Sequence, residues 1–376
     1  MKIGFDAKWL HRGPPSGRRV VHNLVRALAD VARDDELHLF LDARSRNESL
    51  PIDIPAERCH YVWAGINQLS NLLIVPRIAD RLRLDAVVYQ NFSPLRARHA
   101  RVAFVNDVIF ESHPEFFTYA ERLYFKSLRY LTSNADRVCT LSSAERARLT
   151  RYRYASHERV DVVPLAAEDT FTRRGPLSRA AIADVLARLG VSEPFVLYAG
   201  RLNVRKNAAT LIRAMSYVQT SGIQLVLVGA RDATTGDLSA VARSARVGER
   251  VRFLGPRSDA ELSALYAAAS VFCFPSFDEG FGLPPLEAMA SGAAVIVSNV
   301  PALVETCGDA AVYVDPKDAM GIARAIDVIV GDPERRAQLR CAGFARAESF
   351  SWSNSARCLL DSVRAATPVP RVSSRA

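Results

Sequence analysis

The sequence predicts an α/β fold in which two parallel sheets, each wound by helices, form separate domains. Short runs rich in β-branched and aromatic residues alternate with longer stretches of helical periodicity, a pattern typical of doubly wound sheets. A length of 376 residues also exceeds what one hydrophobic core usually supports. The alternation loosens over residues 165–192, which we interpret as the connection between the domains.

The first predicted domain covers residues 1–170. It begins with a strand at 2–7 and a turn-rich loop, and a helix follows whose apolar face contains Val21, Leu24, Val25, Leu28 and Val31. Further strands are predicted at 37–41, 59–64, 86–90, 101–107, 137–142 and 159–164. The helical patterns between them predict helices at 120–135 and 142–152.

The second predicted domain covers residues 190–348. Its strands are predicted at 194–201, 224–229, 250–255, 270–276, 293–299 and 310–315. Its helices are predicted at 208–218, 258–269, 286–292, 318–331 and 333–347. A final amphipathic helix is expected at 350–366, and the Pro/Ser/Arg-rich tail at 367–376 is expected to be disordered.

Composition narrows the class of protein. Hydrophobic residues make up 49% of the chain and charged residues 24%, as in ordinary globular proteins, and no apolar run is long enough to span a bilayer or to serve as a secretory signal. We therefore expect a cytoplasmic protein. Six scattered cysteines favour reduced thiols over a zinc site. The formal net charge of +9 is spread along the chain without a nucleic-acid motif. A solvated, arginine-rich surface explains part of this charge, and among binding functions the charge favours an anionic membrane surface over nucleic acid.

The segment 275–292, PSFDEGFGLPPLEAMASG, has the features of an anion site. It follows an apolar strand, and Gly280 and Gly282 allow a tight turn close to a ligand. Two prolines suit the first turn of a helix, whose free N–H groups attract anions. Glu279 and Glu287 frame the loop. Helix electrostatics alone would explain Glu287, but not a second acid together with the glycines and prolines.

A second segment, FVLYAGRLNVRKN, places two cations at the carboxyl end of a predicted strand. Arg201 follows Gly200 directly, and Lys206 precedes the next helix. Ligands of doubly wound sheets bind at the carboxyl ends of strands, where such cations suit a diphosphate. For this pair alone a surface salt bridge would be the simpler interpretation. Beside the acidic loop, we predict a binding site.

The combination of AGRLNVRK (199–206), EGFGLPPLE (279–287) and SNVPALVE (298–305) resembles the retaining family 4 glycosyltransferases of the GT-B fold. The resemblance is close over most of the second half and looser over the first. It implies two Rossmann-like domains facing a cleft, with an acceptor-binding first domain and a sugar-nucleotide-binding second domain. It also implies that the last helix, with Trp352, crosses back to the first domain.

The resemblance implies a role for each matched residue. Glu287 would hold the ribose hydroxyls, and Glu279 would face the hydroxyls of the transferred sugar. Arg201 and Lys206 would bind the diphosphate and stabilise the leaving group, so that no metal or other cofactor is needed. Residues near the sugar and phosphates would be Gly17, Gly200, Gly280, Phe281, Gly282 and Leu283.

The sequence departs from the family at two places. Ser16 stands where the family usually has a first glycine before Gly17. Asn106 and Asp107 stand where members commonly have a His-Asp pair, whose histidine is thought to lie beside the reacting sugar. Asparagine cannot act as a general base, so the proton of the acceptor would go to the phosphate of the sugar donor or to another group. His113 is a candidate for that group.

Other polar residues are weaker candidates. Lys8, His11 and Arg12 follow the first strand and are candidates for acceptor contact. An aromatic and basic helical stretch either touches a lipid-linked acceptor at a membrane surface or divides into a core face and a solvated face. It contains Tyr119, Arg122, Tyr124, Phe125 and Lys126.

The predicted function is hexose transfer from a nucleoside diphosphate sugar to a saccharide or lipid-linked saccharide hydroxyl in bacterial surface polysaccharide synthesis. GDP-mannose is the first choice of sugar donor, followed by dTDP-rhamnose and UDP-glucose. Two alternatives remain open at this point: a nucleotide-sugar epimerase or hydrolase on the same fold, and a non-catalytic sugar-nucleotide-binding scaffold. We expect no nucleic-acid partner.

Overall fold

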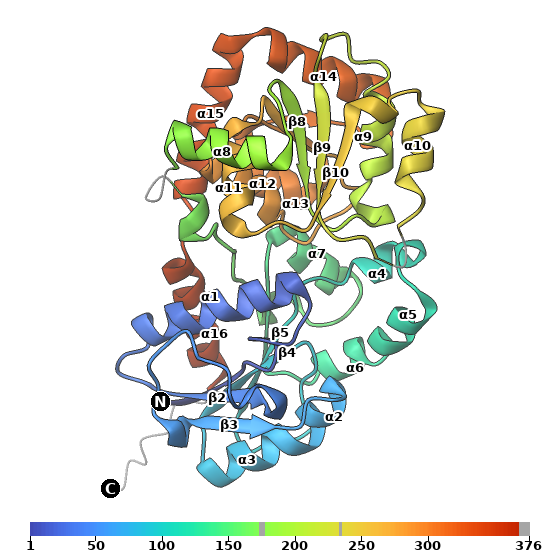
Figure 1. The fold of residues 1–376 in the computed structure, drawn as a ribbon. Helices are drawn as coiled ribbons and strands as arrows, with labels where there is room; N and C mark the ends of the chain where they lie inside the picture. Colours follow the sequence, from blue (N-terminus) through green and yellow to red (C-terminus); the bar gives the residue numbers. More distant parts are fainter. Residues whose placement is uncertain (173–176, 233–234, 368–376) are drawn as a thin grey trace, which may run out of the picture. The chain divides into compact units, whose positions relative to one another are not determined.

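The computed structural model describes residues 1–172, 177–232 and 235–367. The chain divides into two compact units, drawn in Figure 1. Unit 1 comprises residues 1–111, 119–165 and the C-terminal segment from 351, and unit 2 comprises 112–118 and 166–350. The predicted disordered tail lies outside the described residues except for Thr367. That the first domain binds the acceptor and the second domain binds the sugar nucleotide stays a prediction.

Unit 1 contains a parallel seven-stranded sheet in the order β3-β2-β1-β4-β5-β6-β7. The strands are β1 (Lys2–Asp6), β2 (Glu36–Asp42), β3 (Cys59–Val62), β4 (Ala86–Gln90), β5 (Ala100–Phe104), β6 (Arg137–Thr140) and β7 (Val160–Val162). All five residues of β4 are buried, as expected for a central strand with helices on both faces.

The helices of unit 1 lie between these strands in the chain, except for α16, which comes from the C-terminal segment. They are α1 (Pro15–Val31), α2 (Asn67–Leu69), α3 (Val75–Leu82), α4 (Ile109–Ser112, whose last residue falls in unit 2), α5 (Tyr119–Phe125), α6 (Leu128–Thr132), α7 (Ser143–Arg151) and α16 (Trp352–Ala366). The single helix predicted over 120–135 is wrong, because α5 and α6 are separate. No glycine or proline marks the break, so packing rather than local propensity determines it.

The last helix belongs to unit 1, as the sequence predicts. Ser355 Oγ donates to the carbonyl oxygen of Pro164 at 2.5 Å, and the Cys139 thiol donates to Ser362 Oγ at 3.1 Å. Arg364 lies 3.5 Å from Asp35. These contacts join the C-terminal helix to the strands and loops of the first unit.

Unit 2 contains a parallel six-stranded sheet in the order β10-β9-β8-β11-β12-β13. The strands are β8 (Phe195–Ala199), β9 (Gln224–Val228), β10 (Val251–Gly255), β11 (Val271–Phe274), β12 (Val295–Ser298) and β13 (Ala311–Val314). The helices are α8 (Arg179–Leu189), α9 (Ala208–Ala214), α10 (Leu238–Ser244), α11 (Asp259–Ala268), α12 (Leu283–Ala290), α13 (Pro301–Cys307), α14 (Ala319–Gly331) and α15 (Pro333–Glu348).

The α/β fold class predicted from the sequence is confirmed. The predicted helix at 208–218 is shorter than expected and ends at Ala214, while the one expected at 286–292 begins at Leu283 and ends at Ala290. The helices α2, α3, α4, α10 and α13 were not predicted. Within the described ranges, no helix is both long enough and apolar enough to cross a bilayer.

Candidate functional site

Two neighbouring strands of unit 2 bring the predicted cationic and acidic segments together. The strands β8 and β11 pair in parallel, with Val196 opposite Val271. Their carboxyl ends therefore lie at the same edge of the sheet. The loop with Lys206 follows β8 and the loop with Glu279 follows β11, so residues that are 73 positions apart in the sequence become neighbours.

A cluster of charges around the buried Glu279 carboxylate forms at this edge, and its two cations are partly buried. Lys206 Nζ lies 2.5 Å from Glu279 Oε1, and Arg205 Nη1 lies 3.4 Å from Glu279 Oε2. The exposed fractions of these side chains are 12% for Lys206, 17% for Arg205 and 7% for Glu279. Lys206 Nζ also lies 5.0 Å from the centre of the Phe274 ring. Two cations from the loop after β8 thus contact one carboxylate from the loop after β11.

The two cations decide the charge state of Glu279. Burial by itself raises the pKa of this carboxyl, but the charges of Lys206 and Arg205 and the hydrogen bond from Lys206 outweigh burial, and the pKa is lowered from 4.5. Glu279 is therefore ionised at neutral pH. An ionised carboxylate of this kind can accept hydrogen bonds from sugar hydroxyls.

Local backbone geometry places the cationic segment. Asn203 caps the short 3₁₀ turn Val204–Lys206, its side chain accepting from the Lys206 amide at 3.1 Å. Asn207 adopts a left-handed conformation with φ of 57°, and its side-chain amide donates to the carbonyl oxygens of Pro275 and Pro316 at 2.9 and 2.7 Å. These bonds tie the turn to the segments that follow β11 and β13.

Arg205 adds two backbone contacts between the same segments. Its guanidinium donates to the carbonyl oxygen of Asp278 at 2.9 Å, and its own carbonyl accepts from the Phe277 amide at 2.9 Å. Arg205 is not among the site residues predicted from the sequence. Its position beside Lys206 within AGRLNVRK was the one available indication, and nothing in the spacing separates a site residue from a solvated arginine there.

The loop into α12 requires glycine at one position. Gly282 has φ of 108°, and a Cβ atom there would lie 2.5 Å from Leu303 Cδ2. The preceding Phe281 is 5% exposed, and its carbonyl oxygen accepts from Thr306 Oγ1 at 2.7 Å. Glu287 follows on α12 and is 2% exposed.

Arg201 lies on the same loop as Lys206, but its contacts are different. It is 43% exposed on its side chain and lies 3.9 Å from Asp232 Oδ2, while its carbonyl oxygen accepts from Tyr198 Oη at 3.0 Å. Gly200 just before it has φ of 152°, and a Cβ at Gly229 would lie 1.9 Å from the Gly200 oxygen. This is a close backbone approach between the ends of β8 and β9.

A short segment from the first half of the chain also packs in unit 2. The rings of Phe116 and Phe277 stack with centres 5.7 Å apart. His113 Nε2 lies 3.6 Å from Asp278 Oδ2, and its Nδ1 lies 3.0 Å from Glu115 Oε1. His113 therefore lies beside the acidic loop, where the sequence offered only its type as a reason to consider it.

The remaining candidates lie in unit 1. Lys8 is 2% exposed and its Nζ contacts Asp6 Oδ1 and Asn71 Oδ1, each at 2.6 Å. Burial lowers the Lys8 pKa even though Asp6 opposes this effect. Lys8 is thus a buried, paired cation rather than an exposed one.

Two other acceptor candidates share a carboxylate. His11 Nδ1 and Arg12 Nη2 each lie 3.3 Å from an oxygen of Glu48. Gly17 is buried in the first turns of α1, and a Cβ there would lie 2.9 Å from Trp9 Cε3. The first-strand loop therefore packs tightly against α1.

Asn106 and Asp107 follow β5 in the same unit. The buried Asn106 Oδ1 has no hydrogen-bond partner among the residues that the structure describes. Asp107 Oδ1 accepts from the Ile109 amide at 3.4 Å, at the start of α4. These two residues and the acceptor candidates belong to unit 1, whereas the Lys206–Glu279 cluster belongs to unit 2. Over the described ranges, no group of three or more His, Cys, Asp and Glu side chains is arranged to hold a metal ion.

Comparison with known proteins adds the family context. Residues 187–346 match the model "Glycosyl transferases group 1", and residues 17–171 match "Glycosyltransferase Family 4". The chain is 33% identical over 273 residues to the O-antigen chain mannosyltransferase B of Escherichia coli, covering 70% of this chain and 69% of that protein.

Two further likenesses differ in what they cover. The D-inositol 3-phosphate glycosyltransferase of Nocardia farcinica is 31% identical over 248 residues. The matched region covers 63% of this chain but only 54% of that protein. The Anabaena protein HepE, solved in complex with UDP and glucose, has a TM-score of 0.75 over 97% of this chain and 99% of that chain. At 19% identity, this second likeness concerns the fold.

Proposed function

Because the chain belongs to the family 4 glycosyltransferases of the GT-B fold, we propose that it transfers a hexose from a nucleoside diphosphate sugar to a saccharide hydroxyl with retention of configuration. It is a glycosyltransferase; the sugar donor, the acceptor and the stereochemistry are the proposed parts. The observation that supports a nucleoside diphosphate sugar as the donor most directly is the Lys206–Glu279–Arg205 cluster at the ends of β8 and β11.

GDP-mannose is the proposed sugar donor, with dTDP-rhamnose and UDP-glucose next. The mannosyltransferase name of the E. coli relative supports mannose, whereas the UDP and glucose bound to HepE support the last choice. The proposed acceptor is a surface polysaccharide or its lipid-linked precursor, in line with the O-antigen relative. We propose a cytoplasmic location with peripheral contact to an anionic membrane.

In the proposed reaction, the acceptor oxygen forms a bond to the anomeric carbon as the bond from that carbon to the phosphate oxygen breaks. The electron pair leaves with the nucleoside diphosphate, and the acceptor proton passes to the leaving phosphate oxygen. Lys206 and Arg201 offset the charge that develops on this phosphate. No metal is required in this scheme.

Glu279 has two tasks in this proposal. Before the sugar nucleotide binds, its carboxylate neutralises the buried cations, and afterwards it accepts hydrogen bonds from the sugar hydroxyls. Lys206 has three N–H donors, so it can keep its bond to Glu279 while another proton points to the diphosphate. Asn106 contributes hydrogen bonding but no proton transfer. Glu287 binds the ribose.

The test measures nucleoside diphosphate release from GDP-, dTDP- and UDP-sugars, with and without saccharide acceptors and with and without EDTA. We expect release that depends on acceptor and persists in EDTA. Arg201→Ala and Glu279→Ala are each expected to lower kcat about 100-fold or more. The matched controls are Arg324→Ala and Glu334→Ala, which change exposed side chains of the same unit and should retain activity.

Glu279→Gln serves as a second variant that keeps the size of the side chain, and circular dichroism checks that each variant folds. Release that ignores the acceptor would instead identify a hydrolase, and conversion of the sugar without release would identify an epimerase. Full activity in either the Arg201 or the Glu279 variant would refute the roles assigned to them.

A further inference from the structure

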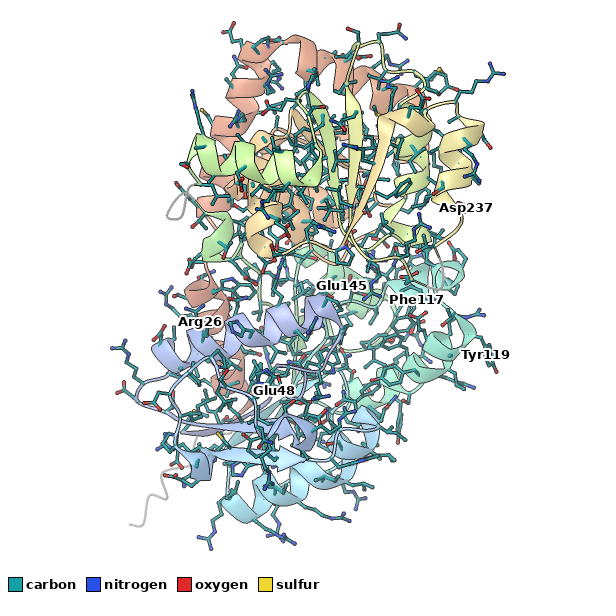
Figure 2. The ribbon with its side chains drawn as sticks, in the orientation of Figure 1. Arg26, Glu48, Phe117, Tyr119, Glu145 and Asp237 are labelled. Carbon is teal, nitrogen blue, oxygen red and sulfur yellow. The ribbon has the colours of Figure 1, made fainter. Side chains whose placement is uncertain are left out.

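Residues 112–118 interrupt unit 1, and we call them the inserted segment. The chain leaves unit 1 after Glu111, contributes the inserted segment to unit 2, and returns to unit 1 at Tyr119, the first residue of α5. Figure 2 marks the segment by its labelled residue Phe117. Ordering these residues on unit 2 costs conformational entropy, so specific contacts have to offset that cost.

A stack of three rings joins the inserted segment to the loop after β11. The His113 and Phe116 rings stack with centres 5.1 Å apart, and Phe116 stacks in turn on Phe277 with centres 5.7 Å apart and planes 12° from parallel. Stacked rings attract each other beyond the gain from burial alone. The Phe277 amide donates to the carbonyl oxygen of Arg205 at 2.9 Å, so the stack holds a residue that already contacts the cationic segment.

Asp278, the next residue of the loop, links His113 to Glu279. Asp278 is 5% exposed, its Oδ1 accepts from the Glu279 amide at 2.8 Å, and its Oδ2 lies 3.6 Å from His113 Nε2. On the other side of the ring, His113 Nδ1 lies 3.0 Å from Glu115 Oε1, which orients the imidazole. A carboxylate held in this way orients the amide of Glu279, and with it the direction in which the Glu279 side chain leaves the backbone.

We propose that His113 and Phe116 are positioning residues for the sugar nucleotide. They hold Phe277 and Asp278 so that the Glu279 carboxylate faces the transferred sugar. Neither residue touches a substrate, and His113 does not take the acceptor proton. The proposal rests on the role of Glu279 in the proposed function, and it adds two residues from the first half of the chain to that site.

Loss of this positioning should raise KM for the sugar nucleotide rather than lower kcat. Without the contacts of the inserted segment, the loop occupies its binding orientation for only part of the time, and the apparent affinity falls by that fraction. If the fraction drops to about one tenth, KM rises about tenfold. Once the sugar nucleotide is bound, the loop is in place and kcat should stay within about threefold of the wild-type value.

Two variants of His113 separate positioning from proton transfer. Both are compared in the rate of nucleoside diphosphate release, with acceptor present and the sugar nucleotide varied. His113→Leu should raise KM about tenfold. His113→Gln should stay within about threefold of the wild type, because glutamine places an amide N–H near the position of Nε2 and can still donate to Asp278, although it cannot act as a base. The control His157→Leu changes an exposed histidine of unit 1 and should leave both constants unchanged.

Phe116→Ala removes the middle ring of the stack and is a second, independent variant. It should also raise KM about tenfold with kcat retained. Its control is Tyr217→Ala, which changes a 49% exposed tyrosine of the same unit and should not alter KM.

Hydrogen exchange measures the position of the loop without any substrate. The amides of Phe277 and Glu279 are both hydrogen-bonded, so their exchange reports on the loop directly. We expect residues 276–282 to exchange about tenfold faster in His113→Leu and in Phe116→Ala, while the buried strand β8 exchanges as in the wild type.

The proposal is overturned if both His113 variants lower kcat at unchanged KM, since His113 would then be the proton acceptor. It is also overturned if exchange of the loop is unchanged, or if β8 exchanges faster to the same extent, since the residues would then only stabilise unit 2 as a whole. If no sugar nucleotide supports release, the proposed transfer reaction fails, and hydrogen exchange by itself decides whether His113 and Phe116 position the loop.

Discussion

Replacing Lys206 by methionine would remove one of the two cations from the buried Glu279 carboxylate. Methionine keeps most of the length of the side chain and can still pack against the Phe274 ring. The carboxylate would lose a partner 2.5 Å away and retain Arg205 at 3.4 Å. The variant therefore isolates the electrostatic contribution of one ion pair.

The size of the effect follows from burial. Removing one partner of a buried ion pair typically costs about 3–5 kcal/mol, because the remaining charge has lost its compensation. Here Arg205 compensates in part, so we expect the free energy of unfolding to fall by about 2–3 kcal/mol at pH 7. Lys317→Met removes an exposed lysine of the same unit and should change stability by less than about 0.5 kcal/mol.

The stability difference between Lys206→Met and the wild type should depend on pH, because Glu279 is the group left without its partner. The pKa of Glu279 is lowered in the folded wild-type protein, so the carboxylate adds stability above its unfolded value of 4.5, and this stability is lost as the pH falls through the folded pKa. Without Lys206, burial is opposed by a single cation and the folded pKa rises. The difference between variant and wild type should therefore shrink as the pH is lowered below 4.5.

Urea denaturation at pH 7 and at several acidic pH values measures this difference. The explanation fails if Lys206→Met unfolds at the wild-type urea concentration at pH 7, or if its deficit stays constant down to acidic pH. A constant deficit would mean that lost packing, and not the charge of Glu279, sets the stability.

Three other substitutions test the remaining parts of the structure, each by urea denaturation. Gly282→Ala should destabilise the protein by about 1–3 kcal/mol, because Gly282 has a left-handed backbone and no space for a Cβ atom. Gly331→Ala is the control, since the space around that Cβ position is open, and it should not destabilise the protein. Equal stability of the two variants would contradict this explanation. Asn207→Gly keeps the left-handed φ but removes two buried hydrogen bonds, and about 1–3 kcal/mol should be lost, so an unchanged midpoint would argue against those bonds. Lys8→Met should cost about 3–5 kcal/mol, since it leaves the buried Asp6 carboxylate without its cation, and a neutral result would show that this ion pair merely offsets its own desolvation.

Much of the fold could be predicted because buried parallel strands have continuous apolar sequences. The strand expected at 194–201 is β8 at Phe195–Ala199, and all five of its residues are buried. The helix expected at 120–135 could not be predicted correctly. Its sequence contains no glycine or proline that would mark the break between α5 and α6, and Phe125 and Leu128 on either side of the break both pack in the same hydrophobic cluster.

The candidate site, like the fold, could be predicted from the sequence only in part. Lys206 and Glu279 were predicted to belong to one binding site because each follows a predicted strand and ligands bind at the carboxyl ends of such strands. Their direct ion pair, and the adjacency of β8 and β11, were not predicted. Arg205 was not predicted, because nothing in the spacing of AGRLNVRK separates a site residue from a solvated arginine. His113 comes from another part of the chain, and its proximity to Asp278 depends on tertiary packing that no local pattern encodes.

The path of the chain has a practical consequence for anyone who wants to study one half of this enzyme alone. A fragment starting at Ala166 would lack Phe116 and His113, which cover Phe277 and Asp278, and a fragment ending at Leu165 would lack α16. No single cut of the polypeptide yields two intact pieces. A chimaera that takes unit 2 from a relative therefore has to take residues 112–118 from that relative as well. The segment from residue 351 onward has to come from the same protein as the rest of unit 1.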